Sequence, residues 1–86
     1  MTRIKKDHQI RREMCCRFVL AMEELGMTAA EISRALGYAN ATTIAKVQKG
    51  ESFVDVERLQ LLAQLRTTDG RHIDLHWLIA GEGRNP

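Results

Sequence analysis

The sequence lacks several features that mark membrane or secreted proteins. It contains no run of 18 apolar residues, and therefore no candidate membrane span. The segment Met1–Lys6 leads into charged residues rather than an apolar stretch, so no signal peptide is expected. No segment alternates between apolar and polar residues for long enough to predict a strand, and there is no internal repeat. These absences favour a cytoplasmic helical protein.

Motifs of metal sites and of common enzymes are also missing. There is no HExxH, no CxxC and no glycine-rich phosphate loop. Cys15 and Cys16 are adjacent, and neighbours on a helix point about 100° apart, so the two thiols are poorly placed to share a metal or a disulfide. We expect both to be reduced, one facing the core and one the surface. His72 and His76 are four apart but span a predicted helix start, so we expect surface histidines, no metal, no cofactor and no enzyme.

Composition and charge point to one small soluble domain. The chain of 86 residues is 44% apolar and 28% charged, which is typical of a globular domain. So short a chain buries a small core, and oligomerisation would add burial. Residues 1–17 hold six basic and two acidic side chains, whereas 18–86 hold seven basic and nine acidic ones. Residues 1–7 therefore form either a phosphate-seeking basic arm or simply a solvated terminus.

The most informative stretch runs from Thr28 to Gly50, and its first half predicts a short helix. Thr28 followed by Glu31 is a capping box, in which each side chain accepts a hydrogen bond from the other residue's backbone N–H. Ile32 and Leu36 lie four apart and share one face of this helix. Gly37 ends it, because glycine adopts a positive φ at no steric cost.

The second half of this stretch predicts a turn and another helix. The turn is Tyr38-Ala39-Asn40, with Asn40 as the N-cap of a helix over Ala41–Lys49. Ile44 and Val47 lie on its inner side, and residues 41–49 contain no acid. Two short helices joined by a tight turn, with a basic second helix, predict a helix-turn-helix whose second helix enters a DNA major groove.

Three further helices are predicted around this pair. The first covers about residues 8–25, with an inner stripe of Ile10, Met14, Phe18, Met22 and Leu25. The fourth is capped by Asp55, with an inner stripe of Val56, Leu59, Leu62, Ala63 and Leu65. After a loop over 67–71, the fifth is capped by Asp74 and ends at Gly81, with Leu75, Leu78 and Ile79 inward. The result is a compact all-α domain of five helices over 8–83, followed by a short tail at 84–86.

Trp77 is the single tryptophan, in the predicted fifth helix. Its expected role is to pack that helix against the rest of the domain. The alternative is that it anchors a dimer interface.

The pattern as a whole resembles the Cro and CI repressor-like proteins of phages and bacteria, the XRE family. The resemblance covers about Phe18 to Gly83 and ends in Trp77–Gly83, WLIAGEG. The other matching residues are Thr28, Glu31, Ile32, Leu36-Gly37-Tyr38, Thr43-Ile44, Gly50, Leu59 and Leu62-Ala63. It implies a five-helix lambda-repressor-like domain that binds a double-stranded DNA operator as a homodimer, in the bacterial cytoplasm at the nucleoid.

Carried over by position, the resemblance implies which residues meet DNA. The base-reading residues would be Asn40, Ala41, Thr42, Thr43 and Lys46. Phosphate contacts would come from Thr28 and Ala29 at the start of the preceding helix, and from the basic residues Arg34, Lys49, Arg3, Lys5 and Lys6. The chain departs from the family pattern in having Ala29 for a common Gln, Ser33 for Ala, Gln48 for Glu, and a turn one residue longer.

Three functions are compatible with this pattern. The first is a sequence-specific transcriptional regulator, a dimeric repressor of phage or mobile-element type. The second is an antitoxin or protein-interaction module, which uses the same fold to bind a partner protein through the basic arm or the tail after Gly81. The third is a helix-turn-helix that no longer binds DNA, and the basic, acid-free segment 41–49 argues against it.

Overall fold

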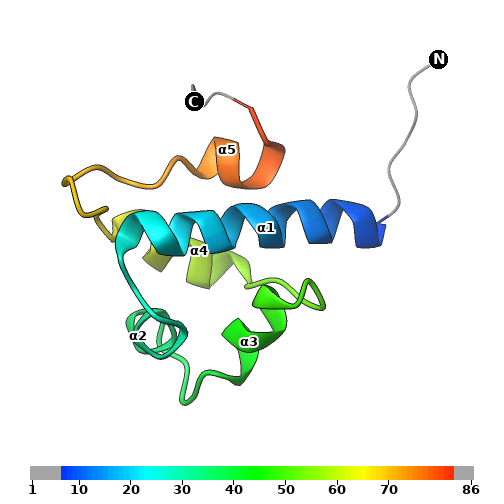
Figure 1. Cartoon of the computed structure of the whole chain (residues 1–86), viewed down its shortest axis with the longest axis horizontal. Helices are drawn as coiled ribbons and strands as arrows, with labels where there is room; N and C mark the ends of the chain where they lie inside the picture. Colours follow the sequence, from blue (N-terminus) through cyan, green and yellow to red (C-terminus); the bar gives the residue numbers. More distant parts are fainter. Residues whose placement is uncertain (1–6, 83–86) are drawn as a thin grey trace.

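The computed structural model describes residues 7–82, which form five helices. The helices are α1 (Asp7–Leu25), α2 (Ala29–Ala35), α3 (Thr42–Gln48), α4 (Val56–Gln64) and α5 (Leu75–Ala80). Within this range the only strand-like pairing is an isolated bridge between Arg66 and His72. Figure 1 shows α1 running across the molecule, with α5 on one side and the α2–α3 pair on the other. The predicted all-α, five-helix fold is confirmed.

The first helix packs against α3 and α5, and α2 packs against α3. The buried residues of α1 are Cys15, Phe18, Ala21, Met22 and Leu25. The predicted stripe is wrong at its first member, because Ile10 is 39% exposed. Ile10 lies near the N-terminal end of α1, whereas the buried residues begin at Cys15. Asp7 belongs to α1 rather than to the predicted arm, so the helix starts one residue early.

The core lies between α1 and the other helices. Its fully buried large side chains include Phe18, Ile32, Leu36, Ile44, Val47, Leu62 and Leu78. Phe18 meets the half-buried ring of Phe53 edge to face, with centroids 5.9 Å apart and planes at 84°. Val54 and Ile73 are also buried, although both lie in connecting segments where no helical periodicity identifies them.

Helices α4 and α5 begin where the sequence predicts. The Asp55 carboxylate accepts a hydrogen bond from the Arg58 N–H at 2.9 Å, and the Asp74 carboxylate accepts one from the Trp77 N–H at 3.1 Å. Their inner stripes are only partly correct. Val56, the first residue of α4, is 76% exposed, whereas Leu62 later in the helix is fully buried.

The C-terminal helix α5 is short, and it ends at a left-handed cap residue, Gly81. Leu78 is buried, but Ile79 is 46% exposed rather than inward. Gly81 has φ 79°, a left-handed conformation that caps α5, and its N–H donates to the Trp77 carbonyl. Trp77 is partly buried against the core cluster, so its predicted packing role is confirmed.

The two cysteines divide as predicted. Cys15 is buried and its Sγ lies 3.2 Å from the Ser52 carbonyl oxygen, whereas Cys16 is exposed. Burial, with Cys16 beside it, raises the pKa of the Cys15 thiol above its ordinary value. No helix among residues 7–82 is long and apolar enough to cross a membrane.

Candidate nucleic-acid interface

The predicted capping box is present at the start of α2. The Thr28 hydroxyl accepts from the Glu31 N–H at 3.2 Å, and the Glu31 carboxylate accepts from the Thr28 N–H at 2.9 Å. These bonds hold the pKa of Glu31 below its ordinary value. They also occupy two early backbone donors, which leaves the N–H groups of Ala29 and Ala30 facing out of the first turn.

The start of α3 differs from the sequence prediction. The helix begins at Thr42, and its N-cap position is Ala41, which makes no side-chain cap bond. Asn40 still serves the helix start, because its side-chain oxygen accepts from the Thr42 N–H at 3.0 Å. The helix thus starts one residue later than predicted, and Asn40 lies just before the N-cap position. At the other end Lys49 is the C-cap rather than a helical residue.

Helical geometry decides which side chains of α3 face solvent. Ile44 and Val47 are fully buried and define the inner side. At about 100° per residue, the opposite side carries Thr42, Lys46 and the C-cap Lys49. All three are exposed. This outward row, with the exposed Asn40 before it, is the group of predicted contact residues that the structure brings together.

Other predicted base-reading residues are less accessible. Ala41 and Thr43 are half-buried, because both lie beside the inner face of α3. Ala45 lies between Thr42 and Lys49 on the outward side and was not predicted. The small side chain of alanine leaves room for another molecule to approach α3 closely at this position.

The α2–α3 pair encloses a hollow of about 200 Å³ on its solvent side. Its lining residues are Ala30, Ser33, Arg34, Tyr38, Ala39, Asn40 and Ala41. Ser33 is 2% exposed where the two helices approach, and its hydroxyl is among the buried polar atoms without a partner in residues 7–82. Arg34 is exposed and lines the same hollow as Asn40, so the structure places this predicted phosphate contact beside the turn.

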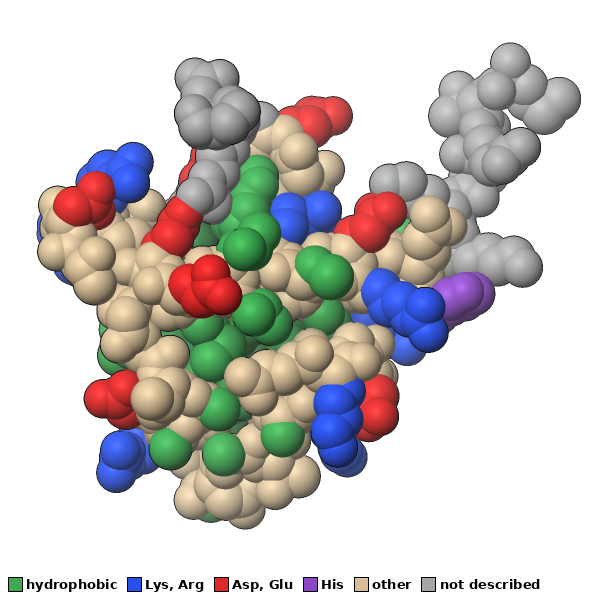
Figure 2. Space-filling model, in the orientation of Figure 1, with side chains coloured by type: hydrophobic (Ala, Val, Ile, Leu, Met, Phe, Trp, Pro, Cys, Tyr) green, Lys and Arg blue, Asp and Glu red, His purple; other side chains and the backbone are tan. Residues whose placement is uncertain are grey.

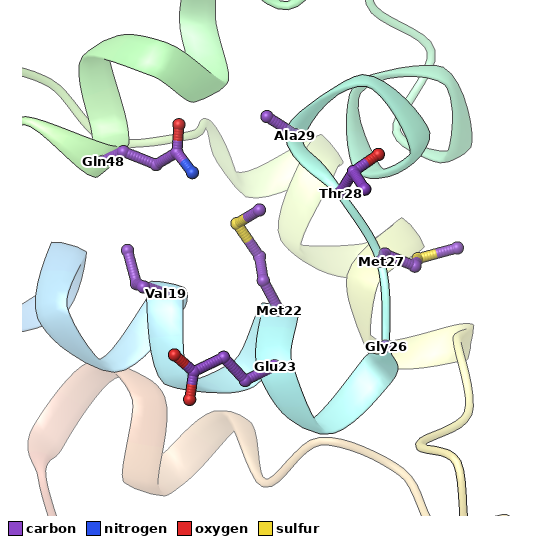
Figure 3. A pocket seen from close by; sticks show the side chains of 8 residues that line it. All are labelled: Val19, Met22, Glu23, Gly26, Met27, Thr28, Ala29 and Gln48. Atoms are coloured by element: carbon purple, nitrogen blue, oxygen red, sulfur yellow. The ribbon is translucent and has the colours of Figure 1, made fainter.

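A second hollow, of about 370 Å³, is lined by residues from the end of α1, the start of α2 and the end of α3 (Figure 3). Thr28 and Ala29 lie on one side of it and Gln48 on the other, with Met22 of α1 between them in Figure 3. Glu23 also lines it. Two carboxylates, Glu23 and Glu31, therefore lie near the predicted phosphate site at the start of α2, and they oppose an anion there.

Positive charge gathers instead near the C-terminal end of α3. Lys46 and Lys49 are exposed there, and α3 itself contains no acid, although the exposed Glu51 follows two residues after Lys49. Arg12 of α1 comes close to this end, since a Cβ built on Gly50 would lie 3.4 Å from Arg12 Cγ. Sequence reasoning assigned no contact role to Arg12, because only the fold joins it to α3. The predicted phosphate contacts Arg3, Lys5 and Lys6 lie outside the described residues.

Neither of the two histidines singled out in the sequence lines the hollow between α2 and α3. His76 on α5 is 3.7 Å from the Glu82 carboxylate, and both side chains are exposed. Among residues 7–82 no three His, Cys, Asp or Glu side chains are grouped to hold a metal ion. The helix-turn-helix surface is therefore the arrangement in the described chain that most closely fits a site.

Comparison with protein-family models, with curated proteins and with solved structures finds no match to this chain.

Proposed function

We propose that the protein is a sequence-specific double-stranded DNA-binding regulator, a dimeric repressor that reads the major groove with α3. The observation that carries this proposal is the division of α3 into two sides. Ile44 and Val47 anchor it in the core, while Thr42, Lys46 and Lys49 form an exposed, acid-free row. A short helix held rigidly by its inner face and open on its outer face suits insertion into a groove.

The chemistry of the exposed row suits base readout. Asn40 can pair with the N6 and N7 atoms of adenine, and Lys46 can donate to O6 and N7 of guanine. Thr42 offers a hydroxyl and a methyl group that can touch the thymine methyl. Each good contact contributes about 1–3 kcal/mol of discrimination between bases.

Phosphate contacts would position the domain on the duplex. Lys49 ends the exposed row at the C-cap of α3, and Arg34 lines the hollow beside the turn. Such contacts supply affinity and salt dependence without reading sequence. The arm residues Arg3, Lys5 and Lys6 are proposed for the same role.

Selection of bound duplexes from a random DNA pool at two salt concentrations tests the proposal. An enriched inverted repeat, with half-sites about one helical turn apart, is the expected result for a two-fold dimer. Binding that weakens with salt but enriches no motif would contradict sequence-specific regulation and leave only the basic charge. The matched control is K46A, which is expected to lose enrichment at specific positions while it retains most non-specific binding.

A second candidate, an antitoxin or protein-interaction module, is favoured by one observation. Leu20 of α1 and Ile79 of α5 are large apolar side chains that are 47% and 46% exposed. Co-purification of a second small protein with the chain, displaced by neither DNA nor salt, would favour this function over the first.

A further inference from the structure

The outward side of α1 carries a row of exposed residues with helical spacing. Arg12, Cys16, Leu20 and Glu23 follow one another at intervals of four, four and three, so they share one face. All four are exposed, on the side of α1 opposite the buried Phe18 and its neighbours. This row is called the α1 outer face below.

The middle of the α1 outer face is apolar. Figure 2 shows hydrophobic atoms gathered in the centre of the view, between α5 and the α2–α3 pair. Cys16, Val19 and Leu20 line a hollow of about 460 Å³, together with residues at the C-terminal end of α3. An exposed leucine beside a hollow with an apolar wall and a polar rim is a typical mark of an interaction site.

We propose that the α1 outer face is the surface through which two copies of this chain associate. The two α1 helices would pack antiparallel about a two-fold axis that passes between Cys16 and Leu20. In this register Cys16 of one copy faces Leu20 of the other, and Arg12 faces Glu23. Because a two-fold axis repeats each contact, one helix face supplies both halves of the interface.

Charge complementarity identifies a second copy as the occupant. The basic Arg12 and the acidic Glu23 lie at opposite ends of the row with the apolar pair between them. Antiparallel packing therefore joins opposite charges twice, whereas parallel packing would set like charges against each other. Glu13 and Glu24, on the other edge of α1, are half-buried and already engaged within the chain.

The antiparallel packing of two α1 helices also suits a dimer that binds DNA. This part of the inference rests on the proposed function. Arg12 and Val19 flank the hollow whose other wall is formed by Gln48 and Lys49, so α3 lies along one edge of the α1 outer face. A two-fold axis perpendicular to both α1 helices places the same edge of each α1 outer face on the same side of the dimer. Both copies of α3 would then face the same way, as an inverted repeat requires.

Charge reversal without DNA tests the proposal, with the full chain and sedimentation equilibrium as the readout. R12E and E23R are each expected to raise the dimer dissociation constant by about tenfold or more, because each turns two attractive pairs repulsive. The double variant R12E/E23R is expected to regain the wild-type value within about threefold. A wild-type chain that stays monomeric at millimolar concentration, or a double variant as weak as the single ones, would overturn the proposal.

A cysteine variant tests the register independently. Under mild oxidation L20C is expected to form an intermolecular disulfide with Cys16 of the second copy, whereas V56C, on the exposed start of α4, is expected to stay monomeric. Equal cross-linking of both variants would refute the interface. Neither experiment contains DNA, so their outcome is separate from that of the duplex selection: a dimer without an enriched motif would reject only the proposed function.

Discussion

Arg17, in the middle of α1, donates a hydrogen bond from Nε to the carbonyl oxygen of Leu78 at 2.8 Å, across 61 positions of sequence. Its Nη2 donates to the carbonyl of Ile79 at 3.0 Å. The guanidinium thus satisfies carbonyl groups at the end of α5, where no intrahelical donor remains and where a positive charge is favourable. A basic residue of the N-terminal segment therefore anchors the last helix.

Replacing Arg17 is expected to loosen α5. R17M keeps the apolar stem but removes both donors, and we expect a loss of about 1–3 kcal/mol in the free energy of unfolding. Urea denaturation followed by circular dichroism measures it. The control R34M, on the exposed side of α2, is expected to change stability by less than about 0.5 kcal/mol. An equal effect of the two variants would show that the link to α5 contributes nothing.

The buried hydroxyl of Ser33 predicts a stabilising substitution. Its oxygen is without a hydrogen-bond partner among the described residues, at the close approach of α2 and α3. S33A removes an unsatisfied buried polar group with little change in shape, so we expect a gain of about 1 kcal/mol. S33V adds volume at the same place and is expected to lose about 1–3 kcal/mol. Thermal unfolding compares the two, and a destabilised S33A would indicate that the hydroxyl is satisfied in solution.

The capping box predicts an acid-side pH dependence. The pKa of Glu31 is lowered in the folded chain by its hydrogen bonds to Thr28, so the unfolded chain binds this proton more tightly. The stabilisation is therefore fully present above the ordinary pKa of about 4.5 and is lost as pH falls through the lower, folded value. Between neutral pH and pH 3, E31Q should show a shallower decline in stability than the wild type. Parallel curves would contradict the assigned cause.

Two sets of lysines are expected to affect DNA binding differently. K46A removes a proposed base contact, so we expect specific affinity to fall by about ten- to a hundredfold while non-specific affinity falls much less. K5A/K6A removes proposed phosphate contacts and should weaken both kinds of binding alike, lowering the salt slope by about two for each protomer of the bound dimer. Fluorescence anisotropy with a selected and a scrambled duplex measures these effects. Identical behaviour of the two variants would reject the division of roles.

Helix starts were predictable because their causes lie within four residues of sequence. The capping box of Thr28 and Glu31 and the carboxylate caps of Asp55 and Asp74 all occur as predicted. The predicted start of α3 was one residue too early. An Asn side chain can accept a hydrogen bond from the backbone N–H two residues after it, as Asn40 does from Thr42, without occupying the N-cap position itself. Only the backbone conformation of the turn decides between these two possibilities.

The burial of apolar side chains was predicted correctly where neighbouring residues on the same helix face are also buried. Periodicity correctly identified Phe18, Ile44 and Val47, each flanked by other inward residues. It failed at Ile10 and Val56, which have the right spacing but lie near helix ends where the core does not cover them. For the candidate site the exposed row on α3 was largely predicted, whereas the proximity of Arg12 to its end was not.

The sequence by itself determined the local structure of this protein: five helices, most of their capped starts, and a basic, acid-free segment after a turn. These follow from hydrogen bonds and side-chain spacing between residues close in the chain. The tertiary structure alone decided that Arg17 holds α5, and that the α1 outer face stays uncovered. Both depend on which helices meet across the core, and contacts between residues about 60 positions apart leave no periodic trace in the sequence.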